Sequence, residues 1–245
     1  MFPEWAQLSE PSVFGEPAGP KVGVIDYKLN NLASICRRLE DAGAAGLEVL
    51  ARPEGLERFS HLVLPGVGAF DAAMENLHAA GWPQALREAT GQGKPLLGVC
   101  LGMQLLGDRS EEGAPTPGLG LVPGQVVRLT ARSGERVPHV GWNEVTALDD
   151  GGLFAGIAPG ADFYFVHSFQ FEPESAADRA AVTPYAGEVV SAVRHGSAYG
   201  VQFHPEKSSA AGLRLLQNFL AVRGPDAEGS SDPDPALEWL RARQG

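Results

Sequence analysis

The stretch from Lys94 to Leu106 reads KPLLGVCLGMQLL, and the rest of the chain can be organised around it. Its short apolar run, Leu96–Val99, predicts a strand buried on both faces, which is typical of parallel sheets. The residues from Met103 onward predict the first turn of a helix. Cys100 therefore lies at a predicted strand-to-helix corner.

Glycines flank this cysteine in the pattern Gly98-x-Cys100-x-Gly102. A sharp strand-to-helix turn needs small neighbours because Cβ atoms would clash there, and this is the geometry of a nucleophile elbow. Backbone N–H groups at the start of the following helix favour the thiolate form of the cysteine. The alternative is a core cysteine that packs beside glycines, and the corner alone does not separate the two.

The composition is that of a globular protein with enough residues for a full core. The 245 residues are 44% hydrophobic and 20% charged. The 30 acidic and 19 basic residues give a formal net charge of −11, which argues against nucleic acid or an anionic membrane as partner. The two cysteines cannot form a disulfide framework, and the sequence shows no secretory signal. We therefore expect a cytoplasmic protein.

Three segments are expected along the chain. Residues 1–20 are rich in proline and predict a flexible N-terminal extension. Residues 21–223 predict the folded domain. Residues 224–245 predict a linker-like C-terminal tail with a short helix at Ala236–Arg243.

Strands and helices alternate in the first half of the folded domain, which predicts an α/β fold with an open, mostly parallel sheet and helices on both faces. After Gly107, shorter β-like runs predict a smaller antiparallel β portion. The predicted strands are Val22–Ile25, Leu47–Leu50, His61–Leu64, Leu96–Val99, Gln125–Leu129, Gly141–Val145, Phe163–Val166, Val189–Arg194 and Tyr199–Phe203. The predicted helices are Asn31–Ala42, Asp71–Ala80, the one after Cys100, and Ala210–Ala221.

Three polar or glycine-rich segments directly follow predicted strands: Pro65–Phe70, Cys100 and His204–Glu206. Ligands of open α/β sheets bind at the carboxyl ends of the strands, so we expect these segments to meet at one edge. Glycines in Pro65–Gly68 leave backbone N–H groups accessible for an oxyanion hole or a phosphate, although a plain tight turn has the same pattern. No spacing typical of a metal site is present.

A base must take the proton of a cysteine nucleophile and return it to the leaving group. His204 precedes Glu206 by two residues, and residues i and i+2 of an extended segment point to the same side. Pro205 between them restricts the backbone. We therefore predict a triad of Cys100, His204 and Glu206, in which the carboxylate orients the imidazole. An isolated His-x-Glu is more often a solvated surface pair, so this prediction depends on the elbow.

The segments Gly98–Gln104 (GVCLGMQ) and Gln202–Ser208 (QFHPEKS) together resemble the class I glutamine amidotransferases, whose triad is Cys-His-Glu. Four more segments resemble the glutaminase subunits of imidazole glycerol phosphate synthase within that class. They are Pro65–Phe70, Ser110–Gly113, Pro138–Asn143 and Tyr164–Ser168. The resemblance covers nearly all of residues 21–223. One segment departs from it: Asp26–Asn31 reads DYKLNN where the family usually has Asp-Tyr-Gly-x-Gly-Asn.

The resemblance implies that L-glutamine is hydrolysed to glutamate and ammonia through a thioester on Cys100, without a cofactor or a metal. It implies that the N–H of Leu101, with that of Val67 or Gly68, stabilises the oxyanion. The residues that it implies for holding the substrate are Gln104, Glu112, Ser168 and Phe169.

The resemblance also implies a heterodimer with a (β/α)8 cyclase subunit. The cyclase receives the ammonia and makes imidazole glycerol phosphate and an aminoimidazole carboxamide ribotide. Trp142, Asn143 and Lys207 are the candidate interface residues. Three alternatives are a related glutaminase that feeds a surface-sugar amidotransferase, a stand-alone cysteine hydrolase, and a regulatory subunit without activity. An intact triad argues against the last of these.

Overall fold

The structure is a computed structural model that describes residues 19–132, 134–149 and 151–224. The extension expected at 1–20 and the tail expected at 224–245, with its helix, lie outside the described residues except at their inner ends.

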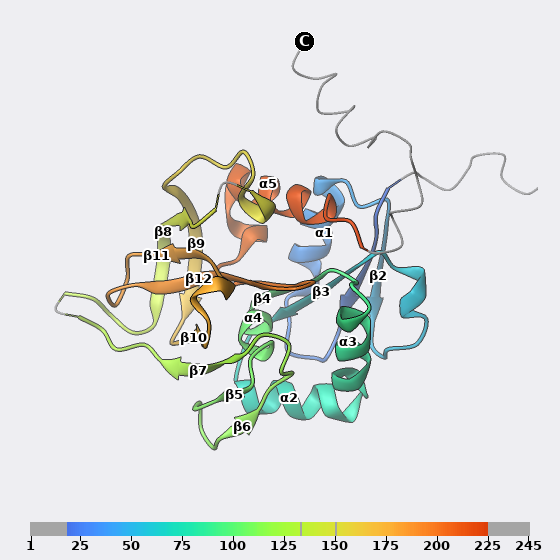
Figure 1. The fold of residues 1–245 in the computed structure, drawn as a ribbon, viewed down its shortest axis with the longest axis horizontal. Coiled ribbons are helices and arrows are strands. Elements are labelled where there is room, and N and C mark those ends of the chain that lie inside the picture. Colours follow the sequence, from blue (N-terminus) through green and yellow to red (C-terminus); the bar gives the residue numbers. More distant parts are fainter. Residues whose placement is uncertain (1–18, 133, 150, 225–245) are drawn as a thin grey trace, which may run out of the picture.

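A mixed sheet of nine strands forms the centre of the described part of the chain (Figure 1). Its first five strands are parallel, and each of the following strands is antiparallel to its neighbour. In spatial order they are β2 (Gly46–Leu50), β1 (Lys21–Ile25), β3 (His61–Gly66), β4 (Leu96–Cys100), β13 (Ala198–Val201), β12 (Val189–His195), β11 (Arg179–Thr183), β8 (His139–Ala147) and β9 (Ala161–His167).

A second, smaller sheet lies beside the first. Its spatial order is β10 (Phe169–Pro173), β7 (Gly124–Arg128), β5 (Arg109–Ser110) and β6 (Thr116–Pro117). The pairs β10–β7 and β5–β6 are antiparallel, whereas β5 and β7 are parallel. β10 follows β9 after a single residue, so the chain passes directly from the large sheet to the small one.

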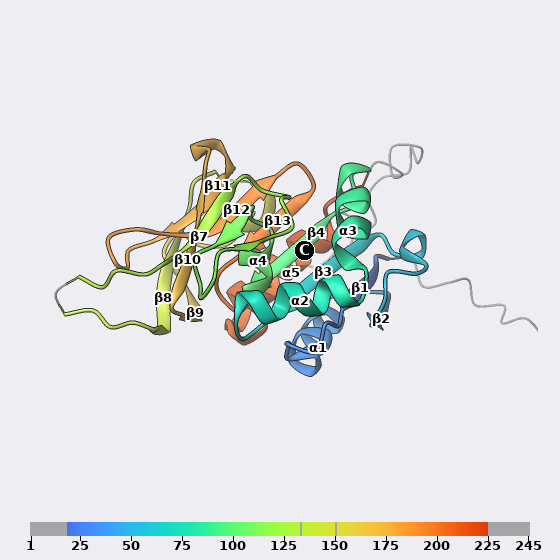
Figure 2. The same ribbon diagram turned by 90° about the horizontal axis from the view of Figure 1, so that it is seen from below.

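Helices cover both faces of the parallel strands. α1 (Leu32–Ala42) and α5 (Ser209–Leu220) pack together on one face, and α2 (Phe70–Ala79), α3 (Trp82–Gly91) and α4 (Leu101–Leu105) lie on the other (Figures 1 and 2). Four 3-10 turns complete the described elements: η2 (Leu56–Arg58), η3 (Gly152–Phe154), η4 (Ala176–Asp178) and η5 (Pro205–Lys207).

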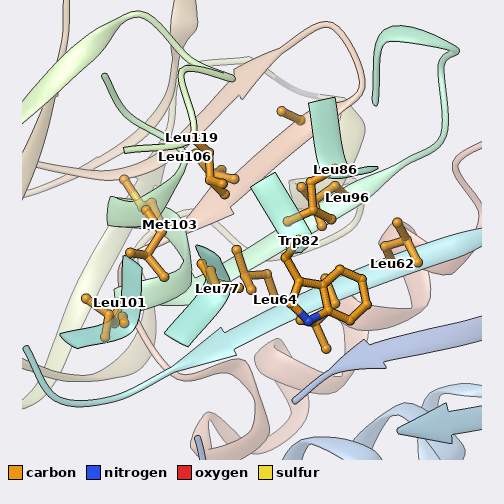
Figure 3. Packing of buried hydrophobic residues seen from close by; sticks show 14 of the residues in the cluster. Leu62, Leu64, Leu77, Trp82, Leu86, Leu96, Leu101, Met103, Leu106 and Leu119 are labelled. Carbon is orange, nitrogen blue, oxygen red and sulfur yellow. The ribbon is translucent and has the colours of Figure 1, made fainter. Parts of the chain in front are cut away.

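The core is divided by the sheet into two hydrophobic clusters. In the first, Trp82 is fully buried and lies against the leucines of β3 and of the neighbouring helices (Figure 3). In the second, the rings of Phe163 and Phe203 lie 4.2 Å apart beneath α5. Both clusters reach β4, and this fixes the position of the strand that ends in Cys100.

The predicted fold class is confirmed: an α/β sheet with helices on both faces and an additional antiparallel portion. The sequence pattern missed α3, the two-residue strands β5 and β6, and the strands β10 and β11. α3 begins with Trp82-Pro83 and buries only one side, so its short pattern was not separated from the loop that precedes β4. β10 gains its partner β7 only through contacts distant in the sequence, whereas β11 forms a hairpin with the following strand β12 and also pairs with the distant β8.

Candidate active site

The predicted strand-to-helix corner at Cys100 is confirmed. Cys100 is the last residue of β4 and has a φ of +56°, a backbone angle that residues other than glycine rarely adopt. A Cβ at Gly98 would lie 2.5 Å from the carbonyl oxygen of Gly102, and one at Gly102 would lie 1.8 Å from the carbonyl oxygen of Leu64. Both flanking positions therefore require glycine for the corner to form.

The predicted meeting of three segments at one sheet edge is also confirmed. Gly66 at the end of β3 pairs with Cys100 at the end of β4. Val99 pairs with Val201, which ends β13 three residues before His204. The parallel register of the central strands thus brings the glycine-rich loop, the cysteine and the histidine together.

His204 and Glu206 form a buried pair. The Nδ1 atom of His204 lies 2.8 Å from Oε1 of Glu206, and each side chain is 5% exposed. The prediction of an extended segment here was wrong, because Pro205–Lys207 form the 3-10 turn η5. The turn begins with proline, whose fixed φ suits a first helical position, and still lets the carboxylate reach back to the ring.

The electrostatic surroundings favour a charged imidazole. Burial by itself would lower the pKa of His204. Interactions with Cys100 and Glu206 outweigh this effect and raise the pKa to about 10. The Nε2 atom of His204, the other ring nitrogen, is buried and makes no hydrogen bond among the described residues.

The expected oxyanion donors lie beside the cysteine, but one of them is engaged. The N–H of Val67 donates to the carbonyl of Leu29 over 3.0 Å. Gly68 follows with a φ of +104°, which glycine adopts without strain. Leu29 belongs to the departing segment, in which Lys28 has a φ of +72° and donates its N–H to Oδ1 of Asp26 over 2.8 Å.

Two of the expected substrate residues contact each other at the start of the second sheet. Gln104 is 5% exposed, and its Nε2 donates to the carbonyl of Phe169 and to Oε1 of Gln202, each over 3.0 Å. The backbone carbonyl of Ser168 accepts from the N–H of Leu129.

Glu112 lies in the loop after β5, and its side chain contacts the start of α2. Its Oε2 accepts the N–H of Phe70, the first residue of α2, over 3.0 Å. The contact places a carboxylate at the start of that helix, where it interacts favourably with the helix dipole.

Of the expected interface residues, Trp142 lies on an exposed face of the β8–β9 ribbon, Lys207 reaches this face from η5, and Asn143 lies on the opposite face of β8. Trp142 is 52% exposed and is the cross-strand partner of Tyr164, and the Nζ atom of Lys207 lies 5.6 Å from the centre of the Tyr164 ring. Val140, which is 56% exposed, and its partner Val166 extend the apolar surface. We call Val140, Trp142, Tyr164 and Val166 the ribbon face.

Asn143, in the middle of β8, contacts the first of two buried histidines that the sequence analysis did not select. Its Nδ2 lies 3.4 Å from Nε2 of His139, and Nδ1 of His139 lies 3.0 Å from Nε2 of His167. Burial lowers the pKa of both histidines to about 4, so both are neutral at pH 7. His139, His167 and Gln202 all lie within the quoted motifs, but nothing in their spacing shows what they contact.

Groups that would point to other kinds of site were sought throughout the described ranges. They contain no cluster of three or more His, Cys, Asp or Glu side chains arranged to hold a metal ion. None of the helices in these ranges combines the length and the apolar character needed to span a membrane.

Comparison with known proteins agrees with this geometry. The chain matches the family model "Glutamine amidotransferase class-I" over residues 23–222. It is 46% identical over 198 residues to the "Imidazole glycerol phosphate synthase subunit HisH" of Moorella thermoacetica, covering 81% of this chain and 93% of the relative. It is 45% identical over 211 residues to the protein of the same name from Chromobacterium violaceum, covering 83% and 99%.

Solved structures share the fold at lower sequence identity. PurLQS from Thermotoga maritima has a TM-score of 0.65 at 18% identity, over 82% of this chain and 98% of that chain. A glutamine amidotransferase from the same organism has a TM-score of 0.58 at 20% identity, over 92% and 91%. The family model and the relatives each span most of the chain, and they show that it belongs to the class I glutamine amidotransferases, among the HisH subunits of imidazole glycerol phosphate synthase.

Proposed function

We propose that this chain hydrolyses L-glutamine to glutamate and ammonia through a thioester on Cys100, as the glutaminase subunit of an imidazole glycerol phosphate synthase. The observation that carries the reaction is the buried His204–Glu206 pair beside a cysteine held at a strand-to-helix corner. The assignment to imidazole glycerol phosphate synthase is supported by the names of the relatives.

In the first step, the thiolate of Cys100, whose proton His204 holds, attacks the side-chain amide carbon of glutamine, and the C–N bond breaks as ammonia leaves. His204 gives the departing nitrogen its proton, which the ring holds at neutral pH because the pKa is about 10. Glu206 accepts the hydrogen bond from Nδ1 and keeps the ring oriented. In the second step, the neutral ring takes a proton from water as the water attacks the thioester. The thioester C–S bond breaks, glutamate leaves, and the Cys100 thiolate beside a charged His204 ring is restored.

Each step passes through an oxyanion, which we assign to the N–H of Leu101 together with that of Val67 or Gly68. Val67 can serve only after it releases the carbonyl of Leu29. The loss of one such donor costs about 2.7–4 kcal/mol of barrier height. We assign the amino-acid end of glutamine to Gln104, Glu112, Ser168 and Phe169, and the mechanism uses no cofactor.

Ammonia released into water is mostly protonated and no longer nucleophilic, so the reaction needs a docked acceptor enzyme. We assign this role to a (β/α)8 cyclase that forms a heterodimer with this chain. Trp142 and Lys207 contact the cyclase from the ribbon face, and Asn143 contacts it from the other face of β8. The ribbon face borders the site, because Sγ of Cys100 lies 3.9 Å from the carbonyl oxygen of Val166. Both cysteines are free thiols, which suits the reducing cytoplasm that we propose as its location.

The test is Cys100→Ser in complex with the histidine-pathway cyclase. We expect glutamine-dependent formation of imidazole glycerol phosphate to fall by roughly 10⁴-fold or more, because a triad loses most of its rate with its nucleophile. High ammonium concentration at raised pH should restore product formation, since the cyclase holds the acceptor. Circular dichroism of the variant checks that the fold is retained.

The outcomes separate the candidate functions. Glutamate release near the wild-type rate by Cys100→Ser would remove the thioester mechanism. A wild-type protein that hydrolyses glutamine but does not bind the cyclase would instead favour the surface-sugar amidotransferase or a stand-alone hydrolase.

A further inference from the structure

Gln202 takes no part in the mechanism above, yet it lies between two of its residues. It is 0% exposed and directly follows β13. Its Oε1 accepts from Nε2 of Gln104 over 3.0 Å, and its Nε2 lies 3.8 Å from Sγ of Cys100. One buried amide therefore joins the expected substrate-binding residue to the nucleophile.

The direction of both amides is set by one backbone carbonyl. The oxygen of Phe169 can only accept hydrogen bonds, so the atom of Gln104 that faces it must be Nε2. The same Nε2 faces Gln202, so the facing atom of Gln202 must be Oε1. The remaining atom of Gln202, which faces Cys100, is then Nε2.

His167 strengthens this anchor. Its Nδ1 lies 2.8 Å from the same carbonyl of Phe169 and must carry a hydrogen, because the carbonyl has none to give. Its Nε2 is then an acceptor, and Nδ1 of His139 donates to it over 3.0 Å. Both lone pairs of the Phe169 oxygen are thus in use, and neither Gln104 nor His167 can rotate without loss of a buried hydrogen bond.

The fixed amide of Gln202 affects both of its neighbours, Gln104 and Cys100. At Gln104, both hydrogens of Nε2 are engaged, and Oε1 makes no hydrogen bond within the described ranges. A lone acceptor suits the ammonium group of an amino acid. At Cys100, the thiol can donate to the carbonyl of Val166, but a thiolate cannot. The N–H of Gln202 can donate to the thiolate, and hydrogen bonds to a charged acceptor are the stronger kind.

We propose that Gln202 is a positioning residue of this site: its amide holds Gln104 with Oε1 turned to the substrate and directs an N–H at the Cys100 thiolate. The substrate end of this role rests on the proposed glutaminase function. The contact with the cysteine does not.

The experiment measures the alkylation of Cys100 by iodoacetamide as a function of pH in wild type and Gln202→Met. Methionine has nearly the same size but offers neither the acceptor nor the N–H. We expect the pH of half-maximal alkylation to rise by about one unit, so that the rate falls about tenfold at a pH well below the wild-type midpoint, as for loss of a hydrogen bond to a charged group. Peptide mass spectrometry separates Cys100 from Cys36, the other cysteine, whose alkylation should not change.

A second variant separates the two ends of the role. Gln202→Glu keeps an acceptor for Gln104 but, as a carboxylate, has no N–H for sulfur. It should raise the alkylation midpoint at least as much as methionine while leaving KM for glutamine near the wild-type value. Gln202→Met should raise KM as well, because Gln104 is released.

Gln84→Met is the matched control, since Gln84 is exposed on α3 and bonds only to Glu88 among the described residues. It should behave as wild type in every measurement. A merely structural role for Gln202 would lower the melting temperature without moving the alkylation midpoint, and unshifted midpoints in the folded Gln202 variants would overturn the proposal. Alkylation needs no turnover, so a chain that failed to hydrolyse glutamine would contradict the proposed function and leave this test intact.

Discussion

The two halves of the nine-stranded sheet bury their residues in different ways. In the parallel half, β3 and β4 are buried at every position, because helices cover both faces. In the antiparallel half, β8 alternates between its two faces and leaves Val140 and Trp142 exposed. The first pattern builds a rigid edge that can hold a strained cysteine, and the second leaves a surface on which another protein can dock.

The two halves meet at the nucleophile. The parallel half contributes side chains to the site: Cys100 from β4, and His204 and Glu206 after β13. The antiparallel half and the small sheet contribute main-chain carbonyls, from Val166 next to the sulfur and from Phe169 next to Gln104. The parallel half thus supplies the side chains of the predicted triad, and the antiparallel half supplies the exposed ribbon face that we propose as the interface, so each can be tested separately.

The largest effect on stability is expected in the parallel half, at the corner itself. Gly102→Ala should lower the free energy of unfolding by about 3 kcal/mol or more, because its Cβ would lie 1.8 Å from the carbonyl oxygen of Leu64. Gly91→Ala, at the end of α3, is the control, since its Cβ meets nothing within 4 Å. Urea unfolding measures both. Equal stability of the two variants would show that the corner can relax.

A pH experiment asks whether the two halves unfold together. Burial lowers the pKa of His61 on β3 and of His167 on β9 from 6.5 to about 4. As pH falls from 6.5 toward 4, the unfolded chain binds protons that the folded chain does not. Each histidine therefore lowers the stability over this window by on the order of 3 kcal/mol.

Substitution of either histidine by glutamine should remove that histidine's contribution to the fall in unfolding free energy between pH 6.5 and 4. If the sheet unfolds as one unit, His61→Gln and His167→Gln will flatten the pH dependence of the same single urea transition. Two transitions, each affected by one variant, would show instead that the halves are independent.

The antiparallel half should respond in binding more than in stability. Trp142→Ala should weaken the proposed cyclase complex by about 2 kcal/mol, or roughly thirtyfold in Kd, because exposed tryptophans at interfaces are frequent hot spots. Leu148→Ala is the matched control, since Leu148 is 51% exposed, against 52% for Trp142. Isothermal titration calorimetry measures both. An unchanged Kd for Trp142→Ala would place the interface elsewhere.

The smallest effect is expected in the departing segment Asp26–Asn31. Lys28 has a φ of +72°, so Lys28→Gly should relieve strain and stabilise the fold by up to about 1 kcal/mol. Asn30→Gly should destabilise it, because Nδ2 of Asn30 donates to the carbonyl of Ile25 over 3.2 Å. Thermal unfolding distinguishes the two signs, and stabilisation by both would contradict this account.

The same two variants report on coupling, since Leu29 between them holds the N–H of Val67. In the complex, wild type should consume about one glutamine for each imidazole product. A change in this ratio, with glutamine hydrolysis retained, would show that the segment acts on ammonia transfer and not on the triad.

Much of this site could be predicted from the sequence, because its signals are local. The apolar run ending at Cys100 and its flanking glycines specify the corner: Gly98 meets the nearby carbonyl of Gly102, although Gly102 also meets the distant carbonyl of Leu64. The placement of His204 and the glycine-rich loop followed from one rule, that parallel strands end at a common edge. Even the wrong prediction of an extended segment at His204–Glu206 left the pair intact, since both conformations bring neighbours i and i+2 within reach.

The rest was decided only by the tertiary structure. Several hydrogen bonds join residues distant in the sequence. They are the bond from Val67 to Leu29, the chain of bonds from His139 through His167 to the carbonyl of Phe169, and the contact of Gln202 with Cys100. Hydrogen bonds of this kind depend on the direction of a backbone carbonyl. Because every residue has a backbone carbonyl, the residue types do not show which carbonyl is used. Side-chain patterns therefore specified which groups carry the chemistry, whereas the packing of the two halves decided which neighbours orient them.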